Sequence, residues 1–312
     1  MPKPVDIGIF MIGKTQVDRE EVQRWLDFIG VQEFVLPEEE TVTDPALLIA
    51  LAAKRCYKSF EPGLNPNVTK VRSDYGEYFD NILKSGHGSV LEHSVYNLAI
   101  ENVSRVFTGE MNRHRAGWAI SEGSMRFIRY SESIPYWVPD SIKGDEPMSD
   151  TRDQLDLLVD DMLDGQYDLN SFQQSLDEGI LPQTASPADE IKRAISRRVF
   201  RRAFSHQESA YRALEMVWAD ELKPDSKFKG KKEITSMMRR IVGMGVATGG
   251  VWSGNIRGLR HVLTMRASAA AEEEILHVFS RVAKRIQETE PHLFGDFTQT
   301  PEGFWVPKYV KV

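Results

Sequence analysis

Cysteine is almost absent from this 312-residue sequence, in which Cys56 stands alone. A lone cysteine forms no internal disulfide, and no group of cysteines and histidines has the spacing of zinc ligands, so we predict neither a disulfide framework nor a metal site. Cys56 lies near the end of an apolar stretch, Leu48–Tyr57, that reads as a helix. We expect it to be a small buried side chain, and we assign it no role as a nucleophile.

Long apolar runs and an excess of positive charge are also missing. No stretch is long enough to cross a bilayer, and Met1–Pro4 does not begin a signal peptide, so we expect a cytoplasmic protein with no membrane partner. The net charge of −7 makes the molecule as a whole repel polyanions. Basic residues gather only in Lys192–Arg202, within a predicted long helix Pro187–Leu222 capped by Ser186, and such a run is usually a solvated or salt-bridged helix face. We therefore predict no nucleic-acid partner; an RNA-binding module with strongly salt-dependent binding is the alternative.

The composition, 41% hydrophobic and 27% charged, is typical of a soluble enzyme with a substantial core. We predict one domain, residues 1–312, of α/β (α+β) class with a helical insertion at about 141–232. That insertion could form a subunit interface, cover an active site or enlarge the fold; we favour a structural role, because the apolar face of Leu155, Leu158, Val159 and Met162 needs a packing partner. Strands are predicted at Val5–Ile12, Ser94–Val103 and Phe127–Tyr130, and helices at Asp44–Lys58, Tyr75–Lys84, Val103–Asn112, Asp150–Leu163 and between Glu272 and Pro291.

The densest group of functional side chains lies between residues 113 and 127. Arg113 and Arg115 flank a histidine with permanently charged, forked donors suited to phosphate or another planar anion. After a six-residue spacer, Glu122–Arg126 adds an acceptor, a hydroxyl, backbone amides beside a glycine and another guanidinium, which together could hold phosphate and sugar hydroxyls. The pattern favours a nucleotide-sized site, the alternative being a solvated basic loop with a Ser/Gly turn.

These residues resemble the signature of flavin-dependent thymidylate synthases, written as Arg-His-Arg, seven arbitrary residues and Ser, although here the spacer Ala116–Gly123 before Ser124 has eight residues. Two further segments match in the same order. Gly86–His93 has the family's Gly-His-x-x-x-x-Glu-His pattern, and Asn255–Arg266 has its Asn-x-Arg-x-x-x-His-x-x-x-x-Arg pattern. The sequence is therefore identified as a member of this family, with clear resemblance over about residues 50–130 and 235–300.

The resemblance implies a flavin-dependent thymidylate synthase-like fold and reductive C5-methylation of a uracil nucleotide, dUMP or UMP. FAD would carry a hydride to C6, methylenetetrahydrofolate would donate the carbon that becomes methyl, and NADPH would supply the reducing equivalents. Family members resemble one another in forming homotetramers with shared active sites, so we expect a homotetramer here. Two other interpretations stay open: a flavin-binding homologue without methyl transfer and a non-catalytic nucleotide-binding module.

The resemblance also implies a role for each matching residue. Its catalytic residues are Arg266, at the uracil carbonyl and N3, and His93, near flavin and folate. The nucleotide-binding set is Glu110, Arg113, Glu122, Gly123, Ser124, Met125, Arg126, Arg240 and Arg266, and the cofactor-binding set is Arg113, His114, Arg115, Glu122, Asn255 and His261. A guanidinium at the uracil ring would stabilise the negative charge that develops there.

Three departures from the family pattern surround the predicted nucleotide. Glu110 stands where Gln is common, Ser121 where Asn is usual, and the spacer before Ser124 is one residue longer. The segment after the expected phosphate arginine lacks the family's proline, and we choose Arg240 over Arg239 for that role. An ionised Glu110 can only accept hydrogen bonds, as from a ribose 2′-hydroxyl, so we hypothesise that UMP reacts as well as or instead of dUMP.

Overall fold

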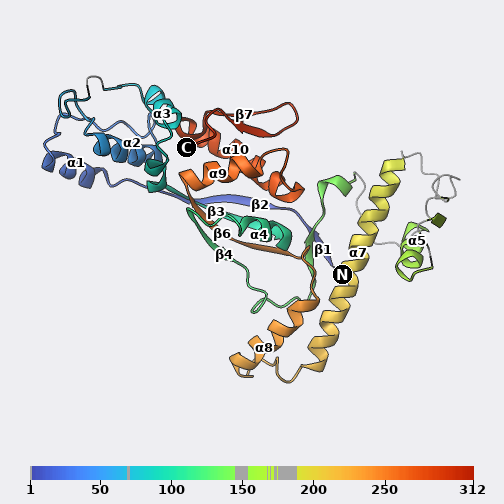
Figure 1. Ribbon diagram of the computed structural model, residues 1–312. Coiled ribbons are helices and arrows are strands. Elements are labelled where there is room, and N and C mark those ends of the chain that lie inside the picture. Colours follow the sequence, from blue (N-terminus) through green and yellow to red (C-terminus); the bar gives the residue numbers. More distant parts are fainter. Residues whose placement is uncertain are drawn as a thin grey trace. The chain divides into compact units, whose positions relative to one another are not determined.

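The computed structural model describes residues 2–68, 71–144, 154–166, 168, 170, 171, 174 and 188–312. The chain consists of two compact units, most of whose elements are labelled in Figure 1. Unit 1 comprises Met1–Asp6, Asn102–Arg105 and Gly123–Thr248, and unit 2 comprises Ile7–Glu101, Val106–Glu122 and Gly249–Val312. Two of the three segments that match the sequence signature, and the Arg-His-Arg part of the third, therefore belong to unit 2.

The main sheet has four strands in the order β2-β3-β6-β4. They are β2 (Gly8–Lys14), β3 (Val95–Ser104), β6 (Ala247–Asn255) and β4 (Trp118–Glu122). β2 runs antiparallel to β3, and β4 runs antiparallel to β6. Along β3 the side chains of Tyr96, Leu98 and Ile100 are buried, as expected for alternate positions of a strand with one face on the core. The strands predicted at Val5–Ile12 and Ser94–Val103 are thus confirmed, the first being divided between β1 and β2.

Unit 2 contains most of the described helices. They are α1 (Arg19–Phe28), α2 (Asp44–Tyr57), α3 (Tyr75–Lys84), the 3₁₀ helix η1 (Gly88–His93), α4 (Arg105–Met111), whose first residue belongs to unit 1, α9 (Ile256–Arg266), α10 (Glu273–Thr289) and α11 (Pro291–Phe294). The predicted helices at 44–58 and 75–84 are confirmed, and local capping explains why the sequence reveals them. Thr43 accepts a hydrogen bond from the amide of Ala46 at the start of α2, and Asp74 accepts one from Glu77 at the start of α3.

The core of unit 2 lies where α4 and α10 meet the sheet. Phe107 stacks on Phe279 with ring centroids 6.2 Å apart and meets Trp252 edge to face at 5.7 Å, and all three side chains are fully buried. The predicted last helix is confirmed: Glu272 caps α10 by accepting from two backbone amides. The apolar face of α10 is buried and consists of Ile275, Val278, Phe279, Val282 and Ile286. A hairpin of β7 (Phe297–Gln299) and β8 (Trp305–Pro307) follows.

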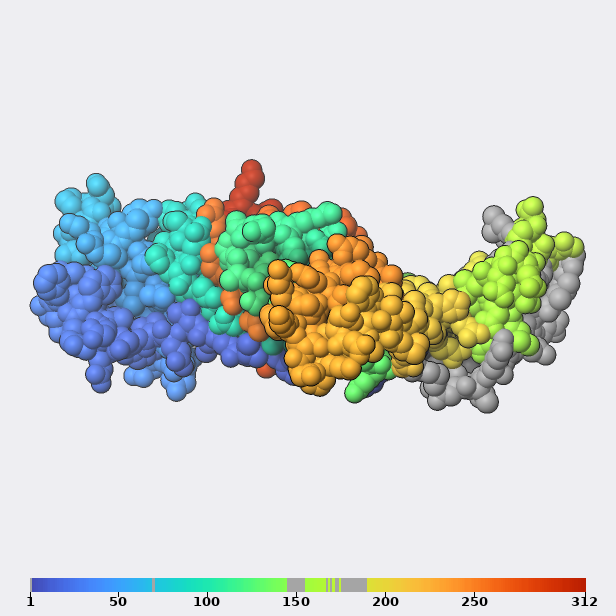
Figure 2. Space-filling view, turned by 90° about the horizontal axis from the view of Figure 1, so that it is seen from below, coloured from blue at the N-terminus to red at the C-terminus, as the bar shows by residue number. Residues whose placement is uncertain are grey.

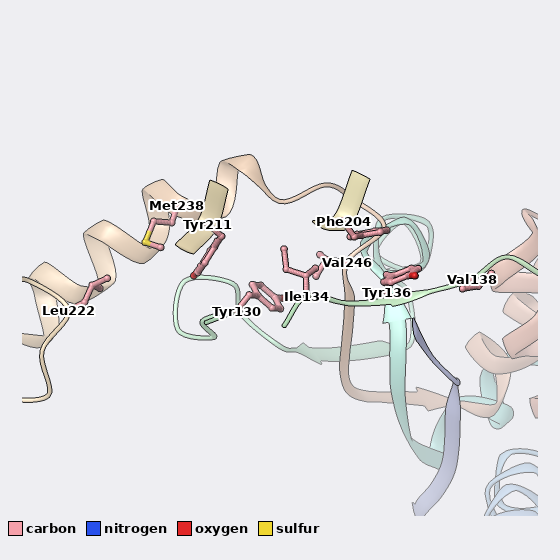
Figure 3. Close-up of a cluster of buried hydrophobic side chains, with 9 residues drawn as sticks. All are labelled: Tyr130, Ile134, Tyr136, Val138, Phe204, Tyr211, Leu222, Met238 and Val246. Atoms are coloured by element: carbon pink, nitrogen blue, oxygen red, sulfur yellow. The ribbon is translucent and has the colours of Figure 1, made fainter. Parts of the chain in front are cut away.

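Unit 1 contains a two-stranded parallel sheet of β1 (Lys3–Val5) and β5 (Pro135–Trp137). Its helices are η2 (Asp140–Ile142), α5 (Gln154–Leu163), α7 (Ala188–Val217), α8 (Phe228–Met238) and η3 (Arg239–Ile241). Figure 3 shows its apolar core, formed by Tyr130, Ile134, Tyr136, Val138, Phe204, Tyr211, Leu222, Met238 and Val246. Within it, Tyr136 stacks on Phe204 with centroids 4.4 Å apart.

One end of α7 packs against α5, as both Figure 1 and the space-filling view of Figure 2 show. Leu158 and Val159 of α5 meet Ile195 of α7, which supplies the packing partner predicted for the apolar face of α5. The basic stretch of α7 is partnered as well, since Arg201 pairs with Asp156 and Arg202 with Asp160. The prediction of a salt-bridged helix face is therefore confirmed, although the helix ends at Val217 and not at Leu222. The predicted cap Ser186, Pro187 and the first residues of the helix predicted from Asp150 lie outside the described residues.

Two local predictions are wrong. Residues 127–130 do not form a strand: the amides of Phe127 and Ile128 donate to the carbonyl of Ser124, which closes a turn. Cys56 is exposed on the last turn of α2, because the apolar face of that helix points the other way.

Within the described ranges, none of the helices has the length and apolarity required to span a membrane. In the same ranges, no three acidic, histidine or cysteine side chains are grouped as metal ligands would be.

Candidate functional site

The site in unit 2 begins at the junction between β6 and α9. Asn255 is the N-cap of α9: its Oδ1 accepts from the amide of Gly258 at 2.8 Å, while its own amide donates to the carbonyl of Gly117 at 2.9 Å. Gly117 has φ of +75°, and a Cβ placed there would lie 2.6 Å from Asn255 Oδ1. Only glycine therefore fits at this position, and the contact ties the loop after the Arg-His-Arg segment to the start of α9.

Arg266, at the other end of α9, is held by two residues of the Arg-His-Arg region. Its Nε donates to Nε2 of His114 at 2.8 Å, and its Nη1 lies 2.7 Å from Oε2 of Glu110. The side chains of Arg266 and Glu110 are 17% and 23% exposed, so the pair is partly screened from solvent. Because Nε2 of His114 accepts this hydrogen bond, the ring carries its proton on Nδ1 when neutral. The predicted catalytic arginine and the predicted cofactor histidine are thus in direct contact.

The protonation of His114 depends on its neighbours. Burial lowers the pKa of His114 below its usual value, and the positive charge of Arg266 and the nearby His261 lower it further, while Glu110 acts in the opposite direction. The rings of His114 and His261 lie edge to face with centroids 5.8 Å apart. At neutral pH the imidazole is therefore uncharged and able to accept from Arg266.

The two arginines of the Arg-His-Arg segment are exposed and remain accessible to a ligand. Arg113 is 74% exposed and lies 3.7 Å from Oε1 of Glu110. Arg115 lines a cavity of about 370 Å³ together with Asn112, Trp118, Ile120 and Glu122. The Nε1 atom of Trp118 itself is buried, without a hydrogen-bond partner among the described residues. The structure thus brings two predicted ligand-binding residues, Arg115 and Glu122, to one polar cavity.

The Gly-His-x-x-x-x-Glu-His segment also meets α9. Arg257 Nη1 lies 2.6 Å from Oε1 of Glu92, and the amide of Ile256 donates to the carbonyl of Ser94 at 2.9 Å. The predicted His93 is exposed on η1, and in the part of the chain that is described its ring forms no hydrogen bond. Its role stays a prediction.

His87, the first histidine of Gly86–His93, was not selected from the sequence, yet it lines a cavity. His87 stacks on Tyr57 with centroids 5.1 Å apart, and its Nε2 lies 2.6 Å from the Tyr57 hydroxyl. Both border a cavity of about 430 Å³ whose wall also contains Arg72 and Tyr78. The Gly86-His87 dipeptide was the available signal. Glu92 and Arg257 were likewise visible in the matching segments, but only their contact across the fold distinguishes them.

The remaining predicted residues belong to unit 1. The carbonyl of Gly123 accepts from Arg105, and the carbonyl of Ser124 closes the turn that exposes Arg126. Met125 packs partly against the apolar core of that unit. Arg240 is exposed on η3, where its Nη1 donates to the carbonyl of Ser236 at 2.6 Å. Gly123, Ser124, Met125, Arg126 and Arg240 therefore stay predictions as nucleotide ligands.

Comparison with known proteins agrees with the sequence signature. A family model described as thymidylate synthase complementing protein matches residues 39–292. A flavin-dependent thymidylate synthase of Corynebacterium glutamicum is 26% identical over 283 residues, which cover 89% of this chain and 91% of the relative. Another, from Geobacter sulfurreducens, is 35% identical over 105 residues, 33% of this chain and 44% of that relative.

Among solved structures, the chain is similar to that of a UMP/dUMP methylase, PolB, from Streptomyces cacaoi bound with 5-Br dUMP. The two share 15% sequence identity with a TM-score of 0.51, over 95% of this chain and 96% of the other. At this identity the likeness concerns the fold alone, and it confirms the predicted fold class.

Proposed function

Because the chain belongs to the flavin-dependent thymidylate synthase family, the thymidylate synthase complementing proteins, we propose that it is a methyltransferase that uses FAD to methylate C5 of a uracil nucleotide. The substrate is dUMP, UMP or both, methylenetetrahydrofolate donates the carbon, and NADPH is the reductant. The observation that supports this most strongly is the meeting of three separate motif segments in unit 2. His114 contacts Arg266, Gly117 contacts Asn255, and Glu92 contacts Arg257.

Arg266 is the residue that acts on the pyrimidine. Its guanidinium is permanently charged, partly buried and fixed at Nε and Nη1 by protein partners. Such a preorganised cation stabilises negative charge on the uracil carbonyls and N3 without reorganising at the moment of reaction. His114 remains neutral and keeps the arginine in place.

The residues of unit 2 fit the chemistry of FAD. The cavity beside Arg115 offers a guanidinium and the amide of Asn112, which are donors suited to the polar and anionic groups of a dinucleotide. Bound FAD supplies the hydride-transfer chemistry that no amino-acid side chain provides. Arg115 and Asn255 hold and orient the cofactor, Asn255 from the rigid start of α9.

We assign the phosphate and sugar of the nucleotide to Arg113 and Glu122 of unit 2. Gly123–Arg126 and Arg240, which belong to unit 1, are proposed as nucleotide ligands on the sequence signature alone. Arg113 supports this role because it is mostly exposed and only weakly paired, so its donors are available to an anion. His93 is assigned to the flavin and folate. We also propose a cytoplasmic homotetramer with shared active sites, built on one domain whose residues 141–232 are an insertion. Dilution should then weaken FAD binding, and a monomer that binds FAD undiminished would contradict that assembly.

The test is turnover of the purified, FAD-loaded protein with NADPH and methylenetetrahydrofolate, comparing dUMP and UMP at saturation. A 5-methyl product is expected, and Arg266→Gln should lower kcat by about a hundredfold or more, as loss of a charge-stabilising donor does. Arg24→Gln, at an exposed arginine paired with Glu21 on α1, is the matched control and should leave turnover unchanged. Bound FAD without any methylated product would contradict the proposal and favour a flavin-binding homologue without methyl transfer.

A further inference from the structure

We infer that Glu110 is a positioning residue that fixes Arg266 against His114 and couples the charge of that arginine to the protonation of the histidine. The inference rests on the proposed function, since it assigns Arg266 to the nucleotide. It concerns a carboxylate that departs from the family pattern and that the sequence led us to place only beside the sugar.

The geometry places Glu110 at the centre of a cationic group. It lies on α4, one turn before Arg113, and Oε2 faces Nη1 of Arg266 at 2.7 Å while Oε1 is 3.7 Å from Nη1 of Arg113. His114, in the loop that follows α4, contacts Arg266, and His261 of α9 lies beside His114. Two arginines thus flank one carboxylate, with His114 and His261 next to them, and it is the only acidic side chain that the described residues bring into this group.

The contacts decide which donors of Arg266 are left for a ligand. A guanidinium has five N–H groups, of which one from Nε serves His114 and one from Nη1 serves Glu110. The remaining donors, on Nη2 and the far side of Nη1, are free in the described part of the chain to face a pyrimidine. Without Glu110 the arginine would keep a single anchor at Nε and could rotate about its last bonds, so fewer molecules would hold the productive orientation.

The charge of Glu110 also acts on the protonation of His114, in the direction opposite to that of Arg266. The histidine must be neutral to accept from Nε, and burial and the positive charge of Arg266 both favour that neutral form. Glu110 is the opposing charge that raises the pKa of His114. An amide at this position can still accept a hydrogen bond from Arg266, but it cannot oppose the positive charge. Glu110→Gln therefore separates the electrostatic role from mere space-filling.

The experiment compares wild-type protein with Glu110→Gln, Glu110→Ala and Glu92→Gln, each loaded with FAD. Glu92 is a matched control for the titration, because its carboxylate binds Arg257 of the same helix at 2.6 Å but is not among the charges that shift His114. The pKa of His114 is measured by NMR on ¹³C-histidine-labelled protein, with the His114→Gln spectrum as assignment. The pH profile of kcat and the KM for the nucleotide are measured in parallel.

We expect Glu110→Gln to lower the pKa of His114, because the opposing negative charge is gone, and to shift the acid limb of kcat to lower pH with it. Glu110→Ala should also lower kcat about tenfold at the pH optimum while KM changes less, because the phosphate contacts remain. Glu92→Gln should leave the pKa of His114 unchanged. A His114 pKa and a kcat profile that are the same in Glu110→Gln as in the wild type would overturn the inference. If wild-type protein makes no methylated product, the proposed function fails, while the titration of His114 still decides the role of Glu110.

Discussion

Arg260 and Asp296 form a bidentate ion pair inside unit 2, and Asp296→Asn is the substitution that tests its energetics. Nη1 and Nη2 of Arg260 lie 2.7 and 2.8 Å from the two carboxylate oxygens, and the side chains are 4% and 6% exposed. The guanidinium also donates to the carbonyl of Leu293 and lies over the ring of Phe297, 4.9 Å from its centroid. Arg260 thus joins α9 to the segment that follows α11.

Asparagine has nearly the same volume as aspartate, so this change creates no cavity. The substitution removes the negative charge, and the NH₂ group of the asparagine then faces either Nη1 or Nη2 of Arg260, both of which are donors. Breaking a buried pair by removing one partner leaves an uncompensated charge, and the expected loss of unfolding free energy is about 3 kcal/mol, at the lower end of the range for such pairs. Urea unfolding at fixed protein concentration, followed by far-UV circular dichroism, measures it.

Glu92→Gln is the matched control, because Glu92 pairs with Arg257 of the same helix but in a setting where the two side chains are 49% and 47% exposed. That change should alter stability by less than about 1 kcal/mol. The double variant Arg260→Met with Asp296→Leu, which removes both charges, should recover much of the loss of Asp296→Asn. If Asp296→Asn were as stable as Glu92→Gln, the argument from burial would be refuted.

Two further changes probe backbone geometry and a buried acid. Gly117→Ala should destabilise the protein by about 2 kcal/mol more than Gly30→Ala and should weaken FAD binding. Both glycines have φ near +74°, but only at Gly117 would the added Cβ meet Asn255. Thermal unfolding and flavin titration compare the two variants, and equal losses of stability would contradict the steric argument. Burial raises the pKa of Glu290, so this carboxyl keeps its proton to higher pH in the folded protein than in the unfolded chain. The stability that the protonated carboxyl contributes is fully present below its unfolded pKa. That stability is lost as pH rises through the folded pKa. Glu290→Gln should therefore gain stability relative to the wild type as pH rises from about 4.5, and a difference that is independent of pH in urea titrations would argue against the shift.

Local signals account for most of what the sequence predicted correctly. The N-cap residues Thr43 and Asp74 mark the starts of α2 and α3 in the sequence. The apolar face of α10 and the acidic residues at its start mark that helix. β6 was not predicted, because Gly249, Gly250 and Gly254 give it the composition of a loop. A larger side chain at Gly250 would meet the backbone of β4, so these glycines are set by packing between strands, which no local pattern reveals.

The candidate site shows the same division. Motif spacing identified Arg266, His114 and Asn255, but not that Glu110 would bind Arg266, because that contact joins residues of α4 and α9 that are far apart in the sequence. The ion pair also revises the expectation that Glu110 accepts from a ribose 2′-hydroxyl, because its carboxylate already pairs with Arg266 and lies near Arg113. The exposure of Cys56 and the turn at 127–130 also depend on contacts between distant parts of the chain, which decide the face of each segment that is buried.

The most direct test of the proposed reaction follows the carbon atom. Purified, FAD-loaded protein is incubated with NADPH, ¹³C-methylene-labelled methylenetetrahydrofolate and either dUMP or UMP, and the nucleotide is analysed by mass spectrometry and NMR. We predict a ¹³C methyl group at C5 of at least one nucleotide, formed only when NADPH is present. Recovery of both nucleotides without label, from protein that retains its flavin, would contradict the account.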